Sequence, residues 1–113
     1  MKIAIIGSRG LNLFDIGAYI PEEATEIVSG GARGVDTYAR DYAKKNGLKL
    51  TEFLPDYNTY GRAAPLVRNI EIIDYADEVY AFWDGKSRGT KYVIDRCNKI
   101  GKKVILYFFE EEY

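Results

Sequence analysis

Histidine is absent from this chain of 113 residues, and cysteine occurs once, as Cys97. A single cysteine excludes an intramolecular disulfide, and the absence of histidine removes the most common protein ligand of zinc and other transition metals. It also removes the side chain that most often acts as a general acid or base near neutral pH. We therefore expect no site for zinc or another transition metal, and any catalysis has to depend on carboxylates, Arg, Lys, Tyr or the substrate.

Apolar segments are short throughout the chain, and the longest, VILYFF at 104–109, is far too short to span a membrane. No charged-then-apolar leader opens the sequence, so we expect a cytoplasmic protein without a membrane partner. The formal net charge of −1 gives no overall field that would attract a polyanion, which disfavours nucleic acid as a partner. With 47% hydrophobic and 29% charged residues, the sequence predicts one globular domain over 1–113.

Five short apolar runs occur along the sequence, and most are typical of strands buried on both faces of a parallel sheet. They lie at 2–7, 26–31, 48–54, 77–83 and 103–109. The third run alternates most between apolar and polar residues, which favours a position at the edge of the sheet. Strands and helices alternate, and this order predicts an α/β fold, a three-layer Rossmann-like sandwich around a five-stranded, mostly parallel sheet.

Apolar residues recur at helical spacing between these runs. The strongest pattern begins at Val35 and ends at Gly47, a residue type that commonly closes helices. A second helix is predicted after Pro65, with an apolar face formed by residues 66, 70 and 73. A third is closed by Gly101, with an apolar face formed by residues 93, 97 and 100. The segment 11–20 predicts a short, imperfect helix.

The sequence Gly85-Lys86-Ser87 is similar to the end of the phosphate-binding loop of NTPases. The full motif needs a glycine five residues before the Gly-Lys pair, so that consecutive backbone N–H groups can surround the phosphates, and Tyr80 occupies that position. The spacing therefore excludes an NTPase of this type. What remains is a Gly- and Ser-containing loop that follows a predicted strand and could hold another anion.

Three glycine-containing loops follow predicted strands: GSRG at 7–10, SGGARGVD at 29–36 and DGKSRGT at 84–90. In an open parallel sheet such loops meet beyond the carboxyl ends of the strands, where ligands bind. Glycine lets the backbone approach a ligand, helix N-termini present partial positive charge, and arginine makes bidentate phosphate contacts. Each loop alone is also typical of ordinary turns and helix caps, so the prediction depends on convergence of all three. The predicted ligand-binding residues are Gly7, Ser8, Arg9, Ser29, Gly30, Gly31, Arg33, Asp84, Ser87, Arg88, Gly89 and Thr90.

Two carboxylates, Asp36 and Asp84, lie in or next to the same loops. Such a pair could serve as base and stabiliser in glycoside cleavage, or hold Mg²⁺ against the phosphate of a nucleotide. Each also has a structural interpretation, Asp36 as a first-turn acid that complements the helix dipole and Asp84 as a turn residue. The sequence leaves these alternatives open. Tyr57 and Tyr60 are candidates for stacking on a base, whereas Trp83 is interpreted as packing.

The motifs GSRG, VSGGARGVDTYARDYA, Arg68-Asn69 and AFWDGKSRGT occur in this order over nearly the whole chain. Together they resemble the SLOG superfamily of Rossmann-like nucleotide-binding domains, most closely its small stand-alone members called YspA- or YpsA-related. Relatives include the Lonely Guy phosphoribohydrolases, which cleave the N-glycosidic bond of nucleoside monophosphates, and the DNA-processing A proteins, which bind single-stranded DNA. The resemblance implies a nucleotide-derived ligand and a homodimer.

The resemblance also bears on catalysis. Arg68 matches the active-site arginine of the Lonely Guy enzymes, and Arg68 with Asp36 forms the candidate catalytic pair. Those enzymes carry a glutamate three residues after a Gly-Thr pair, and here that position holds Val93, which cannot handle a proton. We therefore expect binding of a nucleotide or nucleotide-derived phosphate, as a sensor or carrier. Cleavage of a nucleoside monophosphate and binding of single-stranded DNA stay as alternatives.

Overall fold

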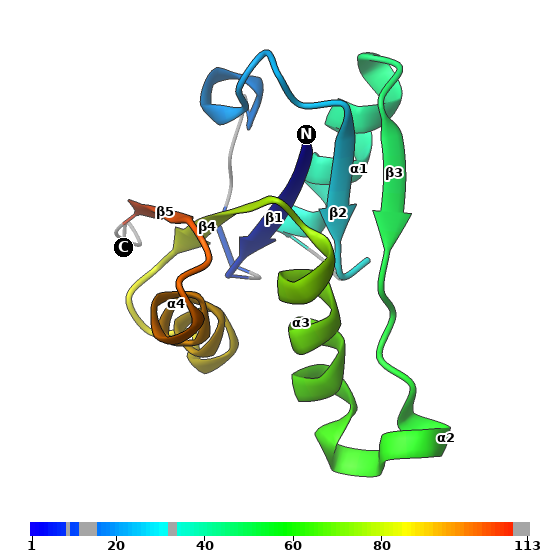
Figure 1. The fold of residues 1–113 in the computed structure, drawn as a ribbon, viewed down its shortest axis with the longest axis vertical. Helices are drawn as coiled ribbons and strands as arrows, with labels where there is room; N and C mark the ends of the chain where they lie inside the picture. The colour runs from blue at the N-terminus through cyan, green and yellow to red at the C-terminus, as the bar shows by residue number, and fades with distance from the viewer. Residues whose placement is uncertain (9, 12–15, 32–33, 110–113) are drawn as a thin grey trace.

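The strands form one sheet in which all neighbouring strands run parallel. A computed structural model describes residues 1–8, 10–11, 16–31 and 34–109. The strands are β1 (Lys2–Gly7), β2 (Glu26–Ser29), β3 (Lys49–Glu52), β4 (Glu78–Trp83) and β5 (Val104–Phe108). Their order in the sheet is β3-β2-β1-β4-β5 (Figure 1). The predicted five-stranded α/β fold is confirmed, and β3 lies at an edge as its alternating pattern indicated.

Helices cover both faces of the sheet and complete a three-layer Rossmann-like sandwich (Figure 1). They are η1 (Ile16–Tyr19), α1 (Val35–Lys45), α2 (Tyr57–Tyr60), η2 (Gly61–Ala63), α3 (Ala64–Tyr75) and α4 (Arg88–Ile100), where η denotes a 3₁₀ helix. One face carries α1 and η1, which pack on side chains such as Ile3 and Ile5 of β1. The other carries α3 and α4, which pack on Ala4 and Ile6 of the same strand. Because successive side chains of a strand alternate, β1 is buried on both sides.

The helix boundaries follow capping signals in the sequence. Ser87 precedes α4, and its Oγ accepts a hydrogen bond from the Thr90 backbone N–H at 3.4 Å. Gly101 ends the same helix in the left-handed conformation. Pro65 stands in the first turn of α3, where a missing N–H removes no intrahelical bond. In the described part of the chain, no helix has the length and apolar character needed to cross a membrane.

The buried faces of two helices differ from the predicted ones. Leu66 of α3 is 43% exposed and Ile100 of α4 is 44% exposed, although apolar spacing predicted that both were buried. In α3, Ile73 is fully buried as predicted, and Ile72 and Ala64 are buried with it. Figure 1 shows that the first turns of α3 extend past the carboxyl ends of the strands, and Leu66 belongs to these turns.

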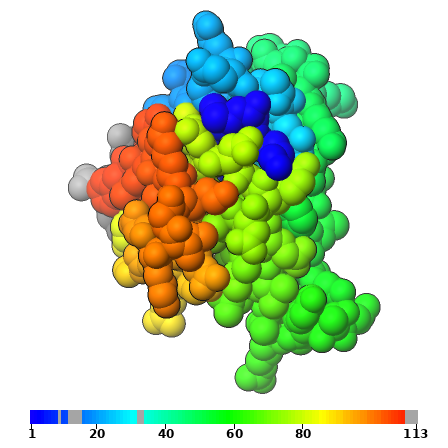
Figure 2. All heavy atoms as spheres, in the orientation of Figure 1, coloured from blue at the N-terminus to red at the C-terminus, as the bar shows by residue number. Residues whose placement is uncertain are grey.

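Some element boundaries also differ. The predicted helix at 11–20 is reduced to the 3₁₀ turn η1, with 12–15 outside the described residues. The stretch 57–63, which precedes the predicted helix after Pro65, forms α2 and η2, and neither has a buried residue. Figure 2 shows this segment projecting from the body of the molecule. Residues at this position pack on no underlying layer, so the core does not dictate their conformation.

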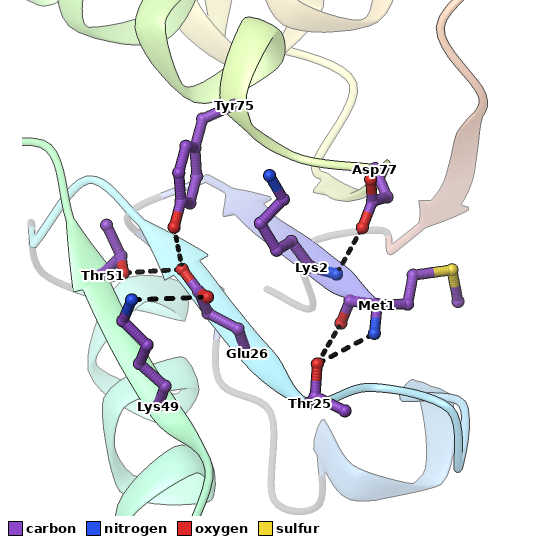
Figure 3. A network of polar contacts seen from close by, with 8 residues as sticks. All are labelled: Met1, Lys2, Thr25, Glu26, Lys49, Thr51, Tyr75 and Asp77. Carbon is purple, nitrogen blue, oxygen red and sulfur yellow. Dashed lines mark hydrogen bonds and ion pairs between the residues drawn. The ribbon is translucent and has the colours of Figure 1, made fainter.

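A buried carboxylate joins two strands and a helix at the amino-terminal end of the sheet (Figure 3). Glu26 of β2 is 8% exposed, and its Oε2 accepts hydrogen bonds from Thr51 Oγ1 at 2.7 Å and from the Tyr75 hydroxyl at 2.5 Å. Lys49 Nζ lies 3.8 Å from Oε1. Burial by itself would raise the pKa of Glu26, but the two hydroxyl donors and the charges of Lys49 and Lys2 hold the pKa below its ordinary value.

We expect Glu26→Gln to destabilise the protein near neutral pH and to weaken the dependence of its stability on acid. The folded-state pKa of Glu26 is lowered, so its ionised form stabilises the fold above the unfolded-state pKa. That contribution is lost as the pH falls through the folded-state pKa. Hydrogen bonds to charged groups contribute about 1.5–3 kcal/mol each, which bounds the expected loss.

Urea unfolding over a pH series that descends from neutral into the acid range measures this effect. The control is Glu22→Gln, because Glu22 is exposed in the turn before β2. Equal stability profiles for the two variants would contradict the role given to Glu26.

Candidate functional site

A cavity of about 440 Å³ opens at the carboxyl ends of β1 and β4. These strands are neighbours in the sheet, but the chain leaves β1 for β2 and β3 on one side and reaches β5 after β4 on the other. The cavity therefore lies at the topological switch point, where open α/β sheets bind their ligands. Its wall consists of Ile6, Gly7, Gly10, Gly30, Asp36, Pro65, Arg68, Asn69, Ile72, Asp84, Ser87, Gly89 and Thr90.

Gly30, directly after β2, brings Arg68 of α3 against one side of the cavity. Arg68 Nη1 donates a hydrogen bond to Gly30 O at 2.8 Å, and the guanidinium packs over the Gly30 Cα. A Cβ at position 30 would overlap the guanidinium and would lie 3.2 Å from Asp36 Oδ2. The missing side chain at Gly30 thus lets Arg68 and Asp36, which is 8% exposed, share one corner of the cavity.

Asp84, at the end of β4, organises the loop on the other side. Its Oδ1 accepts hydrogen bonds from the Lys86 N–H at 2.8 Å and the Ser87 N–H at 2.9 Å, while its own N–H donates to Ser8 Oγ at 3.2 Å. Partial burial would raise the pKa of Asp84, but the backbone donors of Ser87 and Lys86, helped by Ser8, hold the pKa below its ordinary value. Asp84 is therefore an ionised acceptor at neutral pH, and it fixes the path of the loop into α4.

The amino-terminal end of α4 lies at the cavity. Within it, the Thr90 N–H is bonded to Ser87 Oγ, and the Lys91 N–H donates to Ser87 O at 3.2 Å. The first N–H groups of a helix have no intrahelical acceptor, and among the described residues nothing accepts from the N–H groups of Arg88 and Gly89. These two amides carry the partial positive charge of the helix terminus, with Gly89 in the cavity wall.

The structure brings half of the predicted ligand-binding residues together. Both candidate catalytic residues also lie in the wall of the cavity, although they come from different helices. Two predicted residues, Arg9 and Arg33, lie outside the described residues. The predicted ligand-binding residues that line the cavity are Gly7, Gly30, Asp84, Ser87, Gly89 and Thr90.

Four other predicted residues do not line the cavity. Ser8 and Ser29 are buried behind its wall, and their hydroxyl oxygens accept hydrogen bonds from nearby backbone N–H groups, Ser29 Oγ from Gly31 at 3.3 Å. Gly31 faces the side of the sheet that carries β3, where its nearest neighbours are Leu54 and Glu52. Arg88 is exposed, and only its backbone belongs to the helix terminus. The two serine hydroxyls are thus used to shape the loops.

Three residues of α3 that sequence reasoning did not assign to the site also line the cavity: Pro65, Asn69 and Ile72. With Arg68 they follow the spacing i, i+3, i+4 and i+7, so all four lie on one face of the helix. This periodicity could have identified Pro65, Asn69 and Ile72, because a helix that places Arg68 in the crevice also places these three residues there. The residues at 66 and 70, which were assigned to the apolar face, lie on other sides of the helix.

The aromatic residues proposed for the site lie outside the cavity wall. Tyr57 and Tyr60 of α2 are both exposed. Trp83 is partly buried, and its Nε1 donates a hydrogen bond to Ser87 O at 3.0 Å, so it packs against the loop as its interpretation from sequence stated. Among the described residues, no cluster of three or more acidic or cysteine side chains is placed to hold a metal ion.

Gly30→Ala is expected to lower the melting temperature by several degrees, because the new Cβ overlaps the Arg68 guanidinium and has to displace it. Overpacking of this kind costs about 1–3 kcal/mol. Gly89→Ala is the matched control in the same cavity, since a Cβ at Gly89 meets no heavy atom within 4 Å and alanine is the better helix former. Thermal unfolding compares the two variants, and an equal loss in both would contradict the packing described for Gly30.

Comparisons with known proteins assign no function to this cavity. The chain matches no protein-family model, no curated protein and no solved structure.

Proposed function

We propose that the cavity binds the phosphate group of a nucleotide or nucleotide-derived ligand, and that the chain acts as a sensor or carrier of that ligand. The observation that carries the proposal is the convergence of a helix N-terminus, an arginine and glycine backbone on one cavity at the switch point. These groups come from segments far apart in the sequence. The volume of about 440 Å³ falls within the range of about 300–1,000 Å³ that is usual for small-molecule sites.

The proposed binding site of the phosphate is the start of α4. The N–H groups of Arg88 and Gly89 supply donors there, and the helix dipole adds a favourable potential for an anion. A side chain at Gly89 would occupy open space, so the glycine leaves the backbone accessible to a phosphate oxygen. Arg68 supplies a positive charge from the facing helix, held in the cavity wall by its hydrogen bond to Gly30 O.

The two carboxylates suit the sugar part of such a ligand. Asp84 is ionised at neutral pH, and its surroundings lower its pKa further, so it accepts hydrogen bonds and repels a second phosphate. Asp36 lies across the same cavity beside Arg68. Carboxylate oxygens in the wall of a phosphate-binding cavity can accept hydrogen bonds from ribose hydroxyl groups. The mixed lining therefore favours a nucleotide over a free polyanion.

Binding without cleavage is favoured by the surroundings of Val93. This residue stands where the Lonely Guy enzymes carry their catalytic glutamate, and it is fully buried in the core between α4 and the sheet. No titratable group replaces it at that position. On this proposal the chain is a member of the SLOG superfamily that holds its ligand and does not hydrolyse it.

A thermal-shift panel of nucleoside mono- and diphosphates, ADP-ribose and inorganic phosphate tests the proposal, because a ligand selective for the folded state raises the melting temperature. We expect at least one nucleotide to stabilise the wild type and Gly89→Ala to bind it about tenfold or more weakly. The alanine keeps its N–H, but its methyl group would occupy the open space in front of the amide and hold the phosphate away from it. Loss of one hydrogen bond to a charged group costs about 1.5–3 kcal/mol, which corresponds to that factor. Titration calorimetry measures the affinities.

Lys91→Ala is the control for this comparison, since Lys91 pairs with Asp95 on the exposed side of α4 and outside the cavity wall. It should bind the nucleotide as the wild type does. The proposal fails if no compound raises the melting temperature, or if Gly89→Ala binds with wild-type affinity. Single-strand binding with a steep salt dependence would instead favour the DNA-binding alternative.

We expect no release of free base when the wild type is incubated with AMP, since Val93 replaces the glutamate that the related hydrolases use. Chromatographic separation of adenine from AMP over a long incubation measures this. Base release that Arg68→Ala or Asp36→Asn abolishes would contradict the expectation. It would then favour a phosphoribohydrolase with a rearranged acid.

A further inference from the structure

The carbonyl group of Ser87, the N-cap residue of α4, accepts two hydrogen bonds. One comes from the Lys91 N–H at 3.2 Å and is the first bond of the helical ladder. The other comes from the indole Nε1–H of Trp83 at 3.0 Å. A carbonyl oxygen has two lone pairs, so both are engaged here. Because the helical bond alone would satisfy this carbonyl, the indole bond adds a constraint on its direction.

The same peptide unit carries one of the donors proposed for the phosphate. Ser87 C=O and Arg88 N–H are the two polar groups of one peptide unit, which is planar and trans, so they point in opposite directions. A side chain that holds Ser87 O therefore also sets the direction of the Arg88 N–H. Trp83 is thus connected to the proposed phosphate site by one hydrogen bond and one rigid peptide unit.

The peptide unit before Ser87 is held by a different side chain. Its N–H donates a hydrogen bond to Asp84 Oδ1 at 2.9 Å. The peptide units on either side of Ser87 are joined through the φ and ψ rotations of this residue, which are −61° and 121°. Because the first unit is bonded to Asp84 and the second to Trp83, both rotations are restricted. These two consecutive side chains therefore define how the chain enters α4.

Trp83 acts from outside the cavity. It does not belong to the cavity wall, so it does not contact a ligand that occupies the cavity. Its ring is partly buried and meets the Phe108 ring edge-on, with the centroids 6.5 Å apart and the planes at 75°. Its backbone O accepts a hydrogen bond from the Phe109 N–H at 2.9 Å. The strand β5, which lies beside β4 in Figure 1, thus fixes the indole that in turn fixes Ser87.

We infer that Trp83 is a positioning residue of the phosphate site, because its indole N–H holds the Ser87–Arg88 peptide unit in the orientation that directs the Arg88 N–H to a phosphate oxygen. The inference rests on the proposed function, which assigns the phosphate to these amides. A donor that is already oriented binds an anion more tightly than one that first has to be ordered. Loss of the indole bond should therefore weaken phosphate binding although no ligand contact is removed.

Binding of a phosphate should also change the hydrogen bond of Trp83. A negative charge at the Arg88 N–H polarises the peptide unit and makes Ser87 O a stronger acceptor, since hydrogen bonds in a chain strengthen one another. Trp83 is the only tryptophan in the sequence, so it gives a single indole N–H resonance. That resonance should move when a phosphate occupies the cavity.

Trp83→Phe removes the indole N–H and keeps an aromatic ring against Phe108. We expect it to bind AMP about three- to tenfold more weakly in titration calorimetry, which is the effect of losing one neutral hydrogen bond. Tyr75→Phe is the matched control, since it also removes one donor from a partly buried aromatic side chain, at the opposite end of the sheet. It should lower the melting temperature and leave the AMP affinity unchanged, which separates positioning from a general loss of stability.

Amide NMR spectra of the wild type and Trp83→Phe test the orientation itself. Without ligand, the relaxation order parameter of the Arg88 N–H should be lower in the variant, while that of Val93 in the middle of α4 stays the same. Adding AMP or inorganic phosphate to the wild type should move both the Arg88 amide resonance and the indole resonance.

Three results would each overturn the inference: an unchanged Arg88 order parameter in the ligand-free variant, wild-type affinity of the variant for AMP, or an indole resonance that stays fixed while the Arg88 amide moves. If neither AMP nor phosphate moves the Arg88 amide of the wild type, the proposed function fails instead. The ligand-free comparison then still decides whether Trp83 orients this amide.

Discussion

The parallel direction of all five strands is the constraint on which the cavity depends. In a parallel sheet every strand ends at the same edge, so Gly7, Gly30 and Asp84 arrive at one place although they are far apart in the sequence. Reversing a single central strand would carry its loop to the opposite end of the molecule. The direction is maintained by burial, because β1 and β4 are covered on both faces and require apolar side chains at nearly every position.

The two ends of the sheet use carboxylates for different purposes. At the amino-terminal end, Glu26 accepts hydrogen bonds from Thr51 and Tyr75 and stabilises the contact between strands and α3. At the carboxyl end, Asp84 accepts from two backbone N–H groups of its own loop and sets the position of the α4 terminus. The carboxylate of Glu26 thus joins elements that are far apart in the sequence, whereas the carboxylate of Asp84 shapes its own loop beside the amides of the helix terminus.

The elements with strong local signals could be predicted from sequence. The apolar runs marked all five strands, and Ser87 and Gly101 bounded α4, because burial and capping act on neighbouring residues. Leu66 was misassigned, since its burial depends on how far α3 extends past the sheet, and periodicity carries no information on that length. Ser8 and Ser29 are not among the residues that line the cavity at the switch point, for a related reason: which partner a hydroxyl takes is decided by three-dimensional neighbours.

The loop between β4 and α4 is held in place by the edge strand β5 as well as by its own hydrogen bonds. Gly85 has φ of 81°, and a Cβ there would lie 2.8 Å from Phe108 Cε2, so the loop packs directly on β5. Phe108 also packs against the Trp83 ring in a T-shaped arrangement, and the Trp83 Nε1–H donates a hydrogen bond to Ser87 O at the start of α4. The position of the helix terminus at the cavity therefore depends on the packing of β5 as well as on Asp84, because both act on the same short loop.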